Sequence, residues 1–230
     1  MSKPLSSPQI TAAVEDYAKA IYALEAREGR VGTTALAGRL GVSAPSVSGM
    51  IRTLVERGLV THEPYRGITL TPEGVQVALG VIRRHRLLEL FLAETLGVPW
   101  DRVHREAEVL EHALSDELEE RIAARLGDPS HVPHGDPIPT RDGTIDELGG
   151  VALADLAPGQ AAAFARISDA DAAELLTLTR RRISIGDHLD VLPGLPGAPA
   201  GTVRVRCRGA EHVLGPATAA AMRMLVEEQA

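Results

Sequence analysis

The chain has 230 residues, a hydrophobic fraction of 44%, one cysteine and a formal net charge of -7. It is longer than a single domain usually is, it has no apolar run near the roughly 20 residues that cross a bilayer, and its N-terminus lacks a signal-peptide core. With Cys207 alone, internal disulfides and metal sites with two or more thiolates are excluded. We expect a cytoplasmic protein of two or three domains, not associated with a membrane, in which His, Asp and Glu hold any metal.

The charge is distributed unevenly along the chain. Residues 1–72 carry 8 Lys and Arg against 6 Asp and Glu, whereas the rest carries 16 against 25. A local excess of positive charge suits a module that binds DNA phosphates, although a difference of this size also arises by ordinary variation. The first 72 residues are therefore the candidate for binding double-stranded DNA.

These residues predict a winged helix-turn-helix domain. Helical periodicity, cap residues and glycines indicate three helices and a two-stranded hairpin, at residues 12–28, 33–40, 44–57, 59–63 and 67–70. Thr33 or Thr34 is expected to cap the second helix and Ser43 the third. Small Ala37 would let two helices approach, while Gly41 makes the turn between them.

The start of the third helix is the predicted recognition surface. Its hydroxyls and free backbone N–H groups can meet phosphates or base edges, and few long side chains there could read bases. Candidate DNA-binding residues are Thr33, Ser43, Pro45, Ser46, Ser48, Arg52, Tyr65 and Arg66. A winged helix that serves protein contacts is the alternative.

Residues 73–145 predict a helical metal-binding and dimerisation domain. One helix begins at Thr71-Pro72-Glu73 and runs to about Leu96, and a further long helix covers roughly residues 100–126. An apolar stripe on the second helix suits either a homodimer interface or an internal core. Residues 127–143 are crowded with Pro, Gly and Asp and predict a loop.

Residues 146–230 predict a small, mostly β, barrel-like domain. Strand patterns occupy residues 161–167, 188–192 and 202–207, and a helical pattern occupies residues 172–182. The fold class is therefore mainly α with a small β domain, divided into residues 1–72, 73–145 and 146–230.

Side chains that can bind metal gather on the predicted helices. Four of them follow spacings of 4, 3 and 1 residues, which place them in one sector of the second long helix: His104, Glu108, Glu111 and His112. His85 and Glu89 are one turn apart on the preceding helix, and Asp16 could complete the shell from the first helix. A solvated Glu-rich helix face with incidental histidines is the alternative.

Several motifs then occur in a familiar order. They are EDYAKAIYALE at 15–25, RTLVERGLV at 52–60, PYRGITLTPEG at 64–74, RRHRLLELFL at 83–92, VPWDRVHREAEVLEHALSDELEERI at 98–122 and PHGDPIP at 133–139. Together they resemble the diphtheria toxin repressor family, whose metal-dependent repressors include an iron branch and a manganese branch. The resemblance is dense over about residues 15–140, and it is loose over the last 80, which would form the family's SH3-like domain.

The resemblance implies two metal sites. The primary site falls on Asp16, Glu108, Glu111 and His112. The ancillary site falls on His85, Glu89 and His104, with Asp169 and His134 as further candidates. His85 serves a binuclear centre in two-domain manganese members, so it is open to either assignment. Lys19 stands where those members place a glutamate for the second metal, and a protonated ammonium cannot ligate.

Two positions distinguish the branches. Iron members carry Met and Cys where this chain has Asp16 and Glu108, whereas manganese members carry these carboxylates. Hard oxygen ligands suit Mn²⁺, so the chain resembles the manganese branch, with Fe²⁺ as the alternative. The implied protein is a homodimeric repressor of metal-uptake genes that binds a palindromic operator when metal fixes the spacing of its two recognition helices.

A metal-dependent hydrolase is the alternative from another class, because His and Glu clusters also serve catalysis. The sequence has no HExxH motif, no nucleophile elbow and no phosphate-binding loop. We therefore expect a regulator and not an enzyme.

Overall fold

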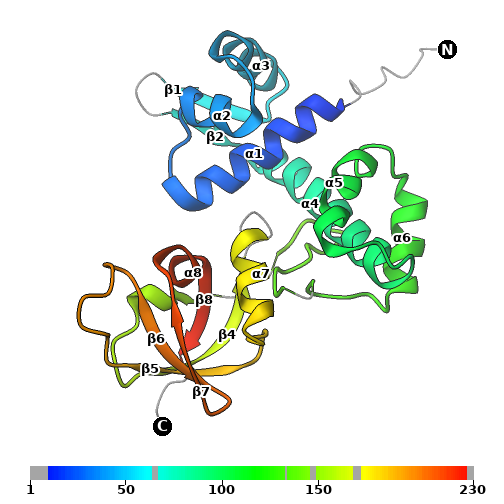
Figure 1. The fold of residues 1–230 in the computed structure, drawn as a ribbon. Helices are drawn as coiled ribbons and strands as arrows, with labels where there is room; N and C mark the ends of the chain where they lie inside the picture. The colour runs from blue at the N-terminus through cyan, green and yellow to red at the C-terminus, as the bar shows by residue number, and fades with distance from the viewer. Residues whose placement is uncertain (1–9, 64–66, 133, 146–148, 168–171, 227–230) are drawn as a thin grey trace, which may run out of the picture. The chain divides into compact units, whose positions relative to one another are not determined.

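The computed structural model describes residues 10–63, 67–132, 134–145, 149–167 and 172–226 (Figure 1). The chain forms two compact units, the first made of residues 1–128 with 139–145 and the second of residues 129–138 with 146–230. Residues 129–138 thus belong with the C-terminal residues, although both flanking segments belong to the first unit. The division into three domains at residues 72 and 145 stays a prediction.

The first unit begins with the predicted winged helix-turn-helix. Its elements are α1 (Ala12–Glu28), α2 (Thr33–Leu40), α3 (Ala44–Glu56), β1 (Val60–Glu63) and β2 (Gly67–Leu70). The two strands pair antiparallel, with Val60 opposite Leu70. Their common core consists of buried aliphatic side chains from all five elements, among them Ile21, Leu36, Val47, Leu54, Val60 and Ile68. This core fixes α3 on the side of α2, as a helix-turn-helix requires.

Local chemistry explains the boundaries of α2 and α3. Ser43 caps α3 as predicted, because its Oγ accepts the backbone N–H of Ser46 at 3.4 Å. Gly41 ends α2 with a left-handed φ of 66°, and Val47 is fully buried at the joint. The predicted threonine cap on α2 is wrong. Gly32 occupies the N-cap without a side-chain hydrogen bond, and Thr33 is the first helical residue.

Helix α4 (Pro72–Glu94) follows the hairpin and starts as the sequence predicts. Thr71 Oγ1 accepts the backbone N–H of Gly74 at 3.1 Å, and Pro72 occupies the first turn, where no N–H is needed. Figure 1 shows that α1 and α5 (Trp100–Leu110) both lie beside α4. Helix α4 therefore connects the DNA-binding helices to the helices that follow.

The predicted single helix over residues 100–126 is wrong. The chain forms α5 and then α6 (Asp116–Arg125), because Ser115 begins a new helix by accepting the backbone N–H of Leu118 at 3.3 Å. The apolar stripe is divided in the same way, since Val103 and Ala107 are buried while Leu110 and Leu118 are exposed. The sequence did not predict the end of α5, because the helical spacing of apolar residues continues from α5 into α6.

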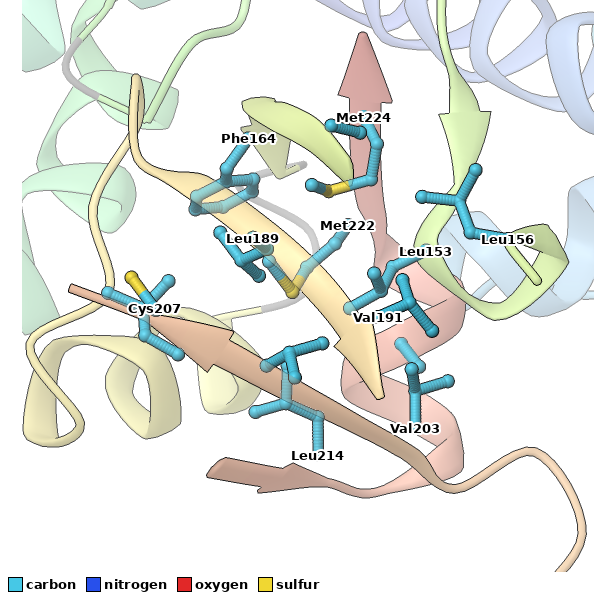
Figure 2. Packing of buried hydrophobic residues seen from close by; sticks show 14 of the residues in the cluster. Leu153, Leu156, Phe164, Leu189, Val191, Val203, Cys207, Leu214, Met222 and Met224 are labelled. Atoms are coloured by element: carbon cyan, nitrogen blue, oxygen red, sulfur yellow. The ribbon is translucent and has the colours of Figure 1, made fainter. Parts of the chain in front are cut away.

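The second unit is a six-stranded antiparallel sheet with short helices. Its elements are β3 (Val151–Ala152), η1 (Leu153–Asp155), β4 (Ala161–Ile167), α7 (Ala172–Arg180), β5 (His188–Leu192), β6 (Val203–Cys207), β7 (Ala210–Leu214), α8 (Pro216–Ala221) and β8 (Met222–Val226). The strand order is β3-β8-β4-β5-β6-β7. Figure 2 shows Phe164, Leu189 and Met222 gathered in its apolar core. The predicted β4, β5, β6 and α7 are present, whereas β3, β7 and β8 were not predicted.

A buried carboxylate closes the turn before β5. Asp187 accepts the backbone N–H of Ser184 at 2.9 Å and the Nε–H of Arg208 at 2.9 Å. Burial raises the pKa of Asp187, but these two donors outweigh burial and hold it below its ordinary value. The ionised carboxylate therefore stabilises this unit.

In the part of the chain that the structure describes, no helix has the length and apolarity needed to cross a membrane.

Candidate metal centre and nucleic-acid interface

Helix α1 and the turn after α5 bring together Asp16, Glu111 and His112. One ligand atom from each lies within 4.8 Å of the other two, and we call these three residues the first cluster. His112 Nε2 lies 3.0 Å from Asp16 Oδ1 and 3.5 Å from Glu111 Oε1. An imidazole nitrogen thus faces two carboxylates, one of them contributed by the DNA-binding helices.

Helices α4 and α5 form the second cluster, which consists of His85, Glu89 and His104. Glu89 Oε1 lies 3.2 Å from His85 Nε2 and 3.0 Å from His104 Nδ1. Glu89 is 2% exposed, and its other oxygen, Oε2, is buried without a hydrogen-bond partner among the residues that the structure describes. Since a buried carboxylate oxygen without a partner is unfavourable, this site suits a cation.

Lys19 and His85 connect the two clusters. His85 Nδ1 donates to Glu111 Oε2 at 2.5 Å, and Lys19 Nζ donates to both Glu111 oxygens at 2.9 Å. Lys19 Nζ also lies 3.2 Å from His85 Nδ1. Because that nitrogen already donates to Glu111, the approach of Lys19 brings two donors together and is not a hydrogen bond. A fixed ammonium therefore stands between the clusters.

The same contacts shift the pKa values of three buried groups. Burial alone would lower the pKa of His85, but hydrogen bonds to Glu111 and Glu89 raise it to about 9. Burial would raise the pKa of Glu89, but hydrogen bonds from His104 and His85 lower it to about 2. Burial also opposes ionisation of Glu111, yet His85 and Lys19 keep its pKa below the ordinary value. Protonated side chains thus balance the carboxylates in the metal-free chain.

The four residues expected in one sector of the second long helix do not converge. His104 faces α4 in the second cluster, whereas Glu111 and His112 follow the last residue of α5, Leu110, and join the first cluster. Glu108 is exposed, and its Oε1 lies 3.3 Å from His104 Nε2. The structure therefore places the Glu108 carboxylate beside His104 and outside the first cluster.

Neither cluster of described residues includes His134. His134 belongs to the second unit, where it is buried and its Nε2 lies 3.4 Å from Asp136 Oδ2. Asp169 lies outside the described residues.

The donor set fits a divalent cation that prefers oxygen and imidazole ligands. Each cluster combines carboxylate oxygens with imidazole nitrogens, and neither contains sulfur.

Two further residues, Glu15 and Arg84, contact this region but were not predicted from the sequence. His112 Nδ1 donates to Glu15 Oε2 at 2.6 Å, and Arg84 Nη2 donates to Glu15 Oε1 at 2.5 Å. Both are neighbours in sequence of expected ligands, but their spacing alone does not reveal this role.

The start of α3 presents the predicted DNA-binding face. Ser43, Pro45, Ser46, Ser48 and Arg52 are all exposed. Thr33 is half-buried and lines a shallow hollow together with Ser48, Arg52 and His62 of β1, which was not predicted. Tyr65 and Arg66 lie outside the described residues. Hydroxyl, guanidinium and imidazole groups thus share one hollow beside the recognition helix with the Glu56 carboxylate and the apolar Ile51 and Val55.

Two family models match adjacent parts of the chain. Residues 9–68 match the iron dependent repressor, N-terminal DNA binding domain. Residues 71–140 match the iron dependent repressor, metal binding and dimerisation domain. The two models together cover more than half of the chain and include both clusters and the recognition helix.

Individual relatives extend the match. The diphtheria toxin repressor of Corynebacterium glutamicum is 35% identical over 193 residues, which cover 77% of this chain and 82% of that protein. The iron-dependent repressor IdeR of Mycobacterium tuberculosis is 39% identical over 126 residues, 54% of each chain. A solved manganese-dependent transcriptional repressor in complex with manganese is 43% identical, has a TM-score of 0.85, and covers 93% of this chain and 100% of its own.

Proposed function

The chain belongs to the family of diphtheria toxin and iron-dependent repressors, which are metal-dependent, dimeric DNA-binding transcriptional repressors, and we propose that Mn²⁺ is its activating metal. Members of this family are not enzymes, so the metal-dependent hydrolase is not retained. Solved structures of a manganese-dependent transcriptional repressor and of an IdeR protein both share its fold. The choice of metal therefore depends on the ligands of this chain.

The observation that carries the proposal is the donor set of the first cluster. Asp16, Glu111 and His112 offer oxygen and imidazole donors without a thiolate or thioether. Hard oxygen donors suit Mn²⁺, whereas sulfur donors favour softer and later metals. We propose that these three residues hold the activating ion. Glu108 is the proposed fourth ligand because the family resemblance implies it; its exposed carboxylate, 3.3 Å from His104 Nε2, would have to turn toward the first cluster to bind the same ion.

The second cluster is the proposed ancillary site. His85, Glu89 and His104 would hold a cation there, and the buried Glu89 oxygen that has no partner in the described part of the chain supports this assignment. His134 and Asp169 are proposed as further ancillary ligands from the second unit. Because His85 also contacts Glu111, occupation of one cluster should affect the other.

The proposed mechanism couples the first cluster to the recognition helix. A bound divalent cation supplies positive charge that allows the carboxylates of α1 and of the turn after α5 to lie together. Asp16 would then hold α1 in one position relative to α4 and α5, and the common core of α1 and α3 transmits this position to the DNA-binding face. In a homodimer this sets the distance between two recognition helices, which suits a palindromic operator in metal-uptake promoters. The protein would act in the cytoplasm, where its DNA target lies.

The test is an anaerobic titration with DNA binding as the readout. An operator is first selected from random duplexes with the metal-loaded protein, and fluorescence anisotropy then follows binding at fixed salt while free Mn²⁺ or Fe²⁺ is raised. We expect Mn²⁺ to activate DNA binding at the lower free concentration. Activation by Fe²⁺ at a lower concentration would assign the chain to iron, and DNA binding without dependence on either metal would contradict the mechanism.

A further inference from the structure

We propose that Glu15, held by Arg84, is a positioning residue that orients the imidazole of His112 toward the metal. This inference rests on the proposed function, because it concerns the same site. Histidines that bind metals usually donate their other ring N–H to a carboxylate, a backbone carbonyl or a water molecule, which fixes both the ring orientation and the nitrogen that is left for the metal. Glu15 supplies such a carboxylate here.

The geometry assigns the two nitrogens of His112 different partners. Glu15 and Asp16 are consecutive on α1, so their side chains leave the helix about 100° apart and approach the ring separately. Nδ1 lies 2.6 Å from Glu15 Oε2, and Nε2 lies 3.0 Å from Asp16 Oδ1. An ionised carboxylate only accepts hydrogen bonds, and the contact to Glu15 is the shorter of the two, so we assign the hydrogen of Nδ1 to Glu15. Nε2 faces the two carboxylates of the first cluster and is the nitrogen that a metal ion bound there would take in place of a proton.

Arg84 holds the carboxylate in place from α4. Its Nη2 donates to Glu15 Oε1 at 2.5 Å, which leaves Oε2 for His112. The side chains of Arg84 and Glu15 are only 16% and 14% exposed, so little water competes for either group. A continuous chain of charge-assisted contacts thus connects α4, α1 and the turn after α5. Helix α1 contributes both a ligand, Asp16, and the group that orients another ligand.

A purely structural ion pair is the competing explanation, and the chain contains a matched control for it. Arg83, the neighbour of Arg84 on α4, donates from Nε to Glu119 Oε1 at 2.7 Å. The two side chains are 15% and 13% exposed, nearly the same as in the first pair. Neither residue belongs to a cluster that could hold metal among the described residues. Removing Glu119 therefore reproduces the loss of an ion pair without the loss of a contact to His112.

The first measurement compares Mn²⁺ affinity in the full chain by calorimetry. Glu15→Ala should weaken binding about 10- to 100-fold, the usual effect of losing such a partner. Glu15→Gln keeps an oxygen that can accept the Nδ1 hydrogen, so it should restore binding to within about fivefold of wild type. Glu119→Ala should change the affinity less than about threefold, even if it lowers the melting temperature as much as Glu15→Ala does.

The second measurement does not need metal. Nitrogen-15 NMR of the histidine side chains should show the Nδ1–H tautomer for neutral His112 in the wild type and in Glu15→Gln, and a loss of this preference in Glu15→Ala. If Glu15→Ala does not fold, Glu15→Asp replaces it, because a carboxylate one methylene shorter keeps the charge but loses reach and should lower affinity at least about tenfold.

The outcomes separate this inference from the proposed function. Equal Mn²⁺ affinities for Glu15→Ala and Glu119→Ala, or a Glu15→Gln variant as weak as Glu15→Ala, would overturn the role of Glu15. An unchanged tautomer in Glu15→Ala would overturn it as well, even if the wild type bound no Mn²⁺. Failure of the wild type to bind Mn²⁺ contradicts the proposed function instead.

Discussion

Replacing Lys19 by Met should tighten Mn²⁺ binding, because it removes a positive charge that already occupies the ligand Glu111. Lys19 Nζ donates to both oxygens of Glu111 at 2.9 Å, so a cation that binds Glu111 has to approach an ammonium held against the same carboxylate. Methionine keeps most of the length of the side chain but removes the charge. Lys19→Arg keeps the charge and serves as the control.

The expected size of the effect follows from the Coulomb energy. Two unit charges about 4 Å apart repel by about 1 kcal/mol in water and about 4 kcal/mol near a protein surface. The Lys19 side chain is 24% exposed, so solvent screens its charge and we take the lower part of this range, a repulsion of about 1 to 2 kcal/mol. This corresponds to a tightening of about 5- to 30-fold. The double charge of the metal makes this a lower estimate.

Two assays on wild type, Lys19→Met and Lys19→Arg check this reasoning. Calorimetry gives the Mn²⁺ affinity, and thermal unfolding gives the stability of the metal-free chain, which should fall in Lys19→Met because Glu111 loses its cation. Lys19→Arg should stay close to wild type in both. If Lys19→Met binds Mn²⁺ no more tightly than wild type, Lys19 organises Glu111 for the metal and does not compete with it.

Three further predictions concern metal choice, DNA binding and acid stability. Asp16→Met combined with Glu108→Cys should shift activation from Mn²⁺ toward Fe²⁺, Co²⁺ or Ni²⁺, since sulfur favours these ions; unchanged Mn²⁺ activation in anisotropy titrations would remove both residues from the primary site. Ser43→Ala with Pro45→Ala should weaken operator binding at fixed salt at least about threefold while calorimetric Mn²⁺ affinity stays unchanged, because the Ser43 cap is worth about 1 kcal/mol and neither side chain lies in a cluster. Asp187→Asn should cost about 1 to 3 kcal/mol of unfolding free energy at pH 7. Because folding depresses the pKa of Asp187, its contribution to the free energy of unfolding is present above the unfolded pKa of about 3.9 and is lost as the pH falls through the folded pKa. The stabilities of wild type and Asp187→Asn, measured by urea unfolding, should therefore converge in acid. A stability difference that stays constant with pH would contradict this.

The sequence predicted those elements whose signals are local. Ser43 and Thr71 are cap residues that act within one turn, and both begin helices where expected. The same chemistry at Ser115 was overlooked, because the apolar periodicity of the flanking segments continues across it. Strand β7 was missed because its hairpin turn is Arg208-Gly209, in which an arginine adopts a positive φ of 49°, a turn without the usual Asn or Asp.

Sequence spacing also predicted only those parts of the site that lie on a single helix. The i, i+4 spacing of His85 and Glu89 suggested a shared face, and both residues lie in one cluster. The role of Glu15 depends on how α1 is rotated against the turn after α5, which only packing determines. Glu108 illustrates the converse, because spacing grouped it with His112 whereas its carboxylate lies 3.3 Å from His104, and His112 follows the last residue of α5.

The path of the chain between the two compact units has a consequence for truncation. Residues 129–138 are seated in the second unit, where the carbonyl of His134 accepts the N–H of Ile167 at 3.1 Å. Gly135 lies so close to β4 that a Cβ would come within 2.2 Å of the Ala165 carbonyl. Deleting residues 146–230 would therefore leave an internal decapeptide without its binding surface, in the middle of the sequence that remains. A stable shortened repressor would need a short polar replacement for residues 129–138, and a single proteolytic cut near residue 146 should not release the C-terminal unit.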